Sequence, residues 1–142
     1  MGRILSIDYG TRRTGIAVTD PAQIIANGLT TIPTAQLMDF LSQYLVREQV
    51  DKVIIGMPKE MTGKPSENAR HIAVFKKKFV QKFPDVPLED YDERFTSVLA
   101  HMTMQQGGLS KTARQNKALV DEISATIILQ SYMDSRKFQI DR

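Results

Sequence analysis

The chain has 142 residues, a net charge of +3 at pH 7 and an isoelectric point of about 9.2. This length favours a single domain over residues 1–142 with its own hydrophobic core. The absence of cysteine excludes disulfides and thiolate metal sites, so a metal would need oxygen or imidazole ligands. No apolar run could span a bilayer and no signal-peptide pattern is present, so we expect a cytoplasmic protein with no membrane partner. The mild positive charge permits a nucleic-acid partner without requiring one.

The first predicted feature is a hairpin of two strands. An apolar run ends on Asp8, residues 9–13 turn the chain, and Thr14–Val18 form the returning strand. Gly10 and Gly15 fit positions that need positive φ or a close approach of another backbone. A carboxylate at the inner end of a buried strand must be hydrogen-bonded, paired or bound to metal. Asp8 therefore either caps the turn through its side chain or belongs to a functional site.

The next segments predict a third strand, a helix and a fourth strand. The third strand covers residues 24–32, with a bulge at Asn27–Gly28. Thr34 is a candidate N-cap for a helix that runs to about Gln49. The continuous apolar run at 53–56 is typical of a strand buried on both faces, and it favours a parallel neighbour.

The second half of the chain continues the alternation of helices and strands. Ser66 can cap a helix whose lysines Lys76–Lys78 form either a nucleic-acid patch or a solvated face. Val86–Tyr91 predicts the last strand, and its acidic residues suit an edge position. The strongest helical pattern runs from about 115 to 135.

Asp121 lies in this last helix in register with Ala125, Ile128 and Tyr132. A carboxylate on a core-facing stripe is costly unless it is paired. The alternative is that Asp121 lies close to the helix N-terminus and interacts with the macrodipole there.

Three carboxylates from three elements could converge at one end of the predicted sheet. Asp8 ends a strand, Glu93 follows another strand, and Asp121 projects from the last helix. Such acids would share protons or bind a hard divalent cation such as Mg²⁺ or Mn²⁺. Two such ions ~4 Å apart support in-line cleavage of a phosphodiester. Spacing alone does not separate this site from acids scattered over an α/β domain.

Four segments follow one another along the chain: LSIDYGTRRTGIAVTD, VIIGMPKEMTGKPSENA, DERFTSVLA and VDEISATIILQSYM. In this order they resemble the motifs of the YqgF (RuvX) family of RNase H-like nucleases, and the similarity spans nearly the whole chain. The family is described as Holliday junction resolvases and, in bacteria, as the nuclease that matures the 5′ end of pre-16S ribosomal RNA. The resemblance implies a single RNase H-like α/β domain. Its mixed five-stranded sheet would have three antiparallel strands, then two parallel ones, and helices on both faces.

The resemblance also implies a catalytic site. Asp8, Glu93 and Asp121 match the metal-binding acids, with Asp8 bridging two Mg²⁺ or Mn²⁺ ions. Arg94 and Thr96 match positions of the D-E-R-x-T signature and are expected to order the site or touch nucleic-acid phosphate.

Two arginines in the first turn, Arg12 and Arg13, are expected to contact the phosphate backbone, although charged turn residues also serve solubility. The expected partner is pre-rRNA or branched DNA, bound by a monomer or by a homodimer that suits a symmetric junction. One alternative is a non-catalytic nucleic-acid-binding or ribosome-assembly module on this fold. Another is a phosphotransferase of the actin-like and sugar-kinase type, which shares the sheet but needs two domains.

Overall fold

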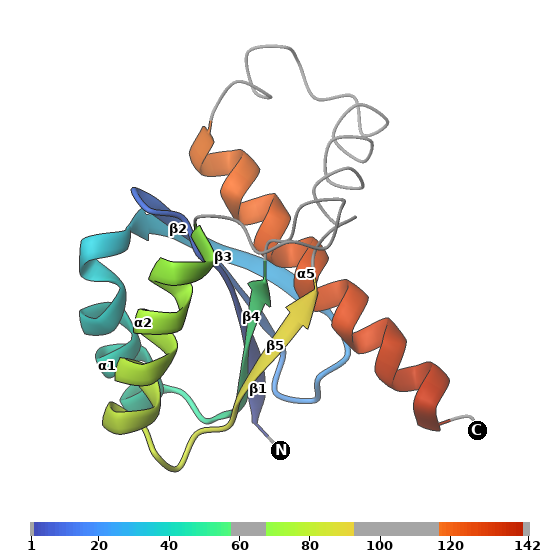
Figure 1. Cartoon of the computed structure of the whole chain (residues 1–142). Helices are drawn as coiled ribbons and strands as arrows, with labels where there is room; N and C mark the ends of the chain where they lie inside the picture. The colour runs from blue at the N-terminus through green and yellow to red at the C-terminus, as the bar shows by residue number, and fades with distance from the viewer. Residues whose placement is uncertain (1, 58–67, 93–116, 141–142) are drawn as a thin grey trace.

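A computed structural model describes residues 2–57, 68–92 and 117–140 of the chain. These residues form one five-stranded sheet with helices on both faces (Figure 1). In chain order the elements are β1 (Arg3–Asp8), β2 (Arg13–Thr19), β3 (Ala26–Pro33), the 3-10 helix η1 (Thr34–Gln36), α1 (Leu37–Arg47), β4 (Val50–Met57), α2 (Asn68–Lys82), β5 (Leu88–Asp92) and α5 (Lys117–Ile140). No helix in this described part of the chain combines the length and apolarity needed to cross a membrane.

The sheet has the strand order β3-β2-β1-β4-β5. β1 pairs antiparallel with β2, and β2 with β3, whereas β4 runs parallel to both β1 and β5. This confirms the predicted mixed sheet of three antiparallel strands followed by two parallel ones. β4 is buried at Val53–Gly56, as its continuous apolar run predicted, and β5 lies at one edge. The predicted bulge in β3 is also confirmed, because the pairing register shifts after Ile16 and leaves Leu29 without a partner in β2.

Alternating side chains of β1 divide the core into two layers. Leu5 and Ile7 pack against α1 and α2, while Ile4 packs against α5 on the other face. Ser6 also faces α5, because its hydroxyl donates a 2.6 Å hydrogen bond to the carbonyl oxygen of Ala125. By this alternation the side chain of Asp8 lies on the α5 face of the sheet.

Thr34 does not cap α1, which corrects the sequence prediction. It begins η1, and α1 follows with Gln36 as its N-cap and no side-chain cap. The Thr34 hydroxyl donates instead to the carbonyl oxygen of Gly10 at 2.5 Å and lies 2.9 Å from the Thr14 hydroxyl. Its backbone N–H donates to the carbonyl oxygen of Arg12 at 2.9 Å. Thr34 thus holds the turn that follows Asp8, and for this reason its oxygen is not available to the helix. The predicted cap at Ser66 lies outside the described residues.

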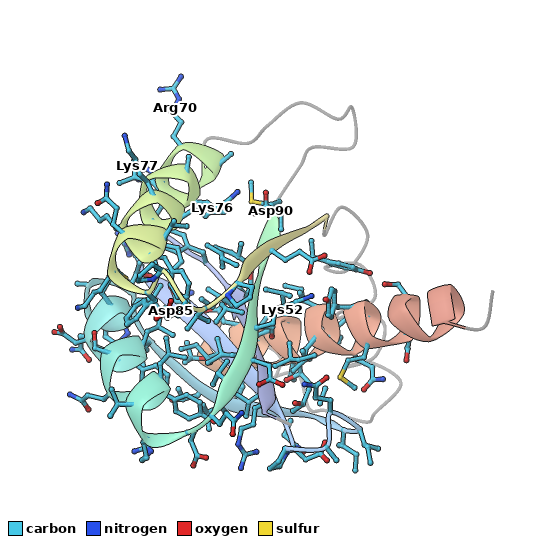
Figure 2. All side chains as sticks on the ribbon, turned by 90° about the horizontal axis from the view of Figure 1, so that it is seen from below. Lys52, Arg70, Lys76, Lys77, Asp85 and Asp90 are labelled. Carbon is cyan, nitrogen blue, oxygen red and sulfur yellow. The ribbon has the colours of Figure 1, made fainter. Side chains whose placement is uncertain are left out.

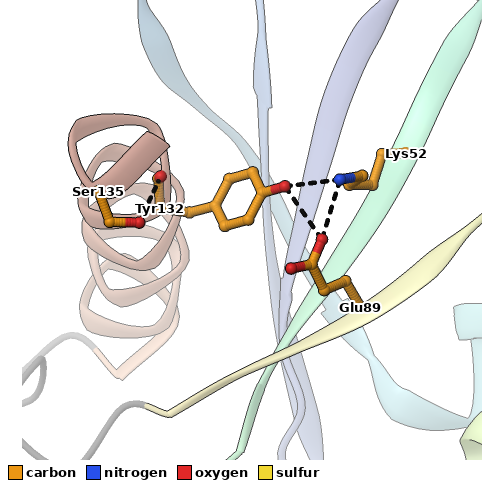
Figure 3. A network of polar contacts seen from close by, with 4 residues as sticks. All are labelled: Lys52, Glu89, Tyr132 and Ser135. Carbon is orange, nitrogen blue, oxygen red and sulfur yellow. Dashed lines mark hydrogen bonds and ion pairs between the residues drawn. The ribbon is translucent and has the colours of Figure 1, made fainter. Parts of the chain in front are cut away.

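A polar network fastens α5 to the parallel half of the sheet (Figure 3). The Lys52 ammonium donates to the Tyr132 hydroxyl at 2.7 Å and to Glu89 at 2.9 Å, and the Tyr132 hydroxyl donates to Glu89 at 3.0 Å. Because these residues come from β4, β5 and α5, the network fixes the helix against two strands. The first half of α5 is then positioned over β1 and β2.

Candidate active site

The backbone of α5 packs directly against β2 at Gly15. A Cβ atom added to Gly15 would collide with the backbone carbonyl oxygen of Asp121. Gly15 is also the residue of β2 that pairs with Asp8. The contact confirms that Gly15 serves a close approach, and it brings Asp121 to the end of β1 where Asp8 lies.

Asp121 lies on the buried side of α5, as its helical register predicted. Ala125 and Ile128 are fully buried on the same face, and Tyr132 is nearly so. α5 begins at Lys117 and has no acidic residue in its first turn, so Asp121 lies beyond the turn where the macrodipole acts most strongly. Register with the core face, and not the helix terminus, therefore accounts for its position.

The Asp8 carboxyl is strongly perturbed by its surroundings. Burial raises its pKa from 3.8 to about 7, and the negative charge of Asp121 adds to this effect. No group among the described residues donates a hydrogen bond to this carboxylate, so the structure gives no support to a turn cap. The ionised form of Asp8 therefore lacks a compensating positive charge or donor in this part of the chain.

Arg13 contacts Asp121, and none of the sequence predictions included this contact. Its Nε donates to Asp121 Oδ2 at 3.0 Å, and the two side chains are 38% and 26% exposed. Arg13 is the first residue of β2, whereas Arg12 lies in the exposed turn before it. The pair joins residues 108 positions apart, so local sequence patterns carry no signal for it. Nucleic-acid contacts by either arginine stay a prediction.

Glu93, Arg94 and Thr96 lie outside the described residues. No group of three metal-ligating side chains occurs within the described ranges, where Asp8 and Asp121 supply two carboxylates. These two donors fit a hard cation, because carboxylate oxygen is the ligand that Mg²⁺ and Mn²⁺ prefer and a buried, uncompensated carboxylate gains from positive charge. Glu93 follows the last residue of β5, and β5 and β1 both run parallel to β4. The carboxyl ends of β1 and β5 therefore lie at the same end of the sheet, on either side of β4.

Comparison with known proteins assigns the family. The sequence model of the RuvX family, described as Holliday junction resolvase, matches residues 2–135. The chain belongs to the RuvX family. A relative from Phocaeicola vulgatus, named "Putative pre-16S rRNA nuclease", is 62% identical over 138 residues, which cover 97% of this chain and 99% of that protein. A relative of the same name from Flavobacterium johnsoniae is 59% identical over 138 residues, 97% of this chain and all of that protein. Family and relatives confirm the predicted nuclease class.

Among solved structures, the RuvC of T. thermophilus in complex with a Holliday junction substrate is similar in fold. It matches with a TM-score of 0.50 and 17% sequence identity, and the match covers 92% of this chain and 96% of that one. At this identity the likeness shows the fold alone. It confirms the RNase H-like fold predicted for this RuvX protein.

Proposed function

We propose that this protein is a divalent-cation-dependent nuclease that hydrolyses phosphodiester bonds, with Asp8, Glu93 and Asp121 as its catalytic acids. The observation that carries the proposal is the juxtaposition of Asp8 and Asp121 at the end of β1, where burial and mutual repulsion raise the pKa of Asp8 to about 7. A bound cation would relieve this repulsion, and a carboxyl with so strongly perturbed a pKa is typical of a functional site.

These acids would hold Mg²⁺ or Mn²⁺, which supply Lewis acidity, an activated water and charge neutralisation when bound. Asp8 is the last residue of the central strand β1, so neighbouring strands on both sides fix its backbone. Arg13 orients the Asp121 carboxylate through its 3.0 Å contact. The Thr34 hydroxyl holds the Gly10 carbonyl oxygen and thereby fixes the turn that carries Arg12. Arg12, in the exposed turn, would contact a substrate phosphate.

The preferred substrate in this proposal is the 5′ end of pre-16S ribosomal RNA, with branched DNA as the other substrate. The names of the relatives support the RNA, and the description of the family supports the DNA. Arg94 and Thr96 would assist at the phosphate beside Glu93. Such a nuclease would work in the bacterial cytoplasm, as a monomer or as a homodimer on a symmetric junction.

Cleavage of a substrate panel tests the proposal. The panel contains a 5′-labelled pre-16S rRNA fragment, single-stranded DNA and a four-way DNA junction, each incubated with Mg²⁺, Mn²⁺ or EDTA. We expect cleavage with either metal and none with EDTA. Binding of a substrate without cleavage in either metal would favour a non-catalytic module. Nucleotide hydrolysis without strand cleavage would favour the phosphotransferase alternative.

A further inference from the structure

A pocket of about 290 Å³ opens on the sheet face opposite Asp8. Tyr9 forms one wall, the start of α1 forms another, and α2 supplies His71, Val74 and Lys78. Tyr9 directly follows Asp8, and its ring packs on Phe75 of α2 with the centroids 5.5 Å apart. The pocket and the acids therefore lie on opposite faces of the sheet at the same end of β1. Asp8 and the pocket residue Tyr9 are adjacent in the sequence.

The pocket combines a flat apolar wall with positively charged or hydrogen-bonding side chains. The Tyr9 ring and the Met38 thioether offer polarisable surface, while His71 and Lys78 offer nitrogen donors. No carboxylate occurs among the described residues that line it. An aromatic wall beside a cation is what stacking and phosphate contacts with a nucleotide require.

The solvent-facing side of α2 extends this positive charge beyond the pocket. α2 contains no acidic residue, and Arg70 and Lys77 point away from the sheet (Figure 2). Lys76 instead turns toward Asp90 of β5 and makes a 2.6 Å ion pair with it. The run of three lysines is thus divided, because Lys76 links α2 to β5 whereas Lys77 and Lys78 remain exposed.

We propose that this pocket binds one nucleotide of the substrate strand next to the scissile phosphodiester. The base stacks on Tyr9, and its phosphate contacts Lys78 and His71. A nucleic-acid chain that passes over the end of β1 then reaches the pocket on one face of the sheet and the two acids on the other face. The inference rests on the proposed function, because it names how the substrate of that site is held.

Binding measured in EDTA separates this pocket from cleavage. Val74→Trp narrows the pocket, and Val80→Trp is its matched control, since both valines lie on α2 and are 55% exposed while only Val74 lines the pocket. Lys78→Gln removes the proposed phosphate contact, and Lys82→Gln removes an exposed lysine one turn further along α2. The probes are a fluorescein-labelled single-stranded RNA, its DNA counterpart, and adenosine 5′-monophosphate as competitor. Circular dichroism confirms that each variant is folded.

We expect Val74→Trp and Lys78→Gln each to raise the oligonucleotide Kd about tenfold, and both controls to stay within about twofold of the parent. Only Lys78→Gln should reduce the slope of log Kd against log salt, by about 0.7. The monophosphate should compete in the parent and not in Val74→Trp. Equal affinities for all four variants, or a parent that binds none of the probes, would overturn the pocket assignment. Cleavage by the parent in Mg²⁺ is scored separately, so the nuclease proposal can stand or fall independently.

Discussion

The backbone carbonyl oxygen of Asp121 lies over Gly15, the residue of β2 that pairs with Asp8, and leaves no room there for a side chain. The two acids are thus brought together by the packing of one backbone on another. Side-chain contacts such as the one from Arg13 then adjust the position of the Asp121 carboxylate. A change in the spacing between α5 and β2 should therefore affect the fold and the site together.

Gly15→Ala should destabilise the protein by about 1–3 kcal/mol, because the added methyl group meets backbone that cannot rotate away. Urea unfolding measures the loss. Gly28→Ala is the control, since a Cβ there meets the Glu122 side chain, which can move. A Gly15→Ala protein as stable as Gly28→Ala would show that α5 is not fixed at this contact.

The stability of the metal-free protein should depend on Asp8 in a defined pH range. The folded-state pKa of about 7 exceeds the ordinary value of 3.8, so the folded protein holds the Asp8 proton more tightly than the unfolded chain. The resulting stabilisation is fully present below pH 3.8 and is lost as pH rises toward about 7. The Asp8→Asn variant has no titratable group at this position, so its stability does not fall in this way as the pH rises. Its stability advantage over the parent should grow by on the order of 2 kcal/mol between about pH 5 and about pH 8.

Urea unfolding in EDTA at the two pH values measures this difference. Asp134→Asn is the control, because Asp134 is an exposed acid of α5. An Asp8→Asn advantage that is the same at both pH values would mean that Asp8 is not buried as an acid in the folded state.

Mg²⁺ should stabilise the parent through Asp121. An ion that binds only the folded site adds RT ln(1 + [Mg²⁺]/Kd), about 2.7 kcal/mol at 100 times Kd. Asp121→Ala should flatten this response, whereas Asp134→Ala should retain it. Thermal unfolding across a Mg²⁺ series gives the comparison. Parallel curves for all three proteins would place the metal site elsewhere.

Arg13→Gln should tighten Mg²⁺ binding about threefold, because the guanidinium competes with the cation for the Asp121 carboxylate. Arg12→Gln should leave Mg²⁺ affinity unchanged, because Arg12 lies in the exposed turn. Isothermal titration with Mg²⁺ compares the two variants with the parent. A weaker affinity in Arg13→Gln would mean that the orientation of Asp121 by Arg13 contributes more to Mg²⁺ binding than the competition between the guanidinium and the cation takes away.

The strands were predictable because each carries a local signal, whereas the arrangement of all five in one mixed sheet was predicted from the family resemblance. The apolar run of β4 shows burial on both faces, and the residues between Asp8 and Thr14 indicate a tight turn. The register of Asp121 with Ala125 and Ile128 likewise placed it on the core face of its helix.

Other features depend on contacts that are distant in sequence. Thr34 has the residue type and position of a helix cap, yet its hydroxyl bonds Gly10, 24 residues earlier. The Arg13–Asp121 pair joins a strand to a helix near the other end of the chain. The pocket beside Tyr9 exists only where α1 and α2 meet the end of β1. Local periodicity carries no information on such contacts, because they arise from the packing of separate elements.

Single-turnover cleavage of a 5′-labelled pre-16S rRNA fragment and a four-way junction shows whether Asp8 belongs to a metal-dependent nuclease centre. With Mg²⁺ present, Asp8→Asn should cut at least about 10³-fold more slowly than the parent, because the amide keeps the shape but loses the charge that binds metal. Substrate affinity in EDTA should stay within about twofold, and Asp134→Asn should cleave at the parental rate. Cleavage by Asp8→Asn at the parental rate in Mg²⁺ would mean that Asp8 has no part in metal-dependent cleavage.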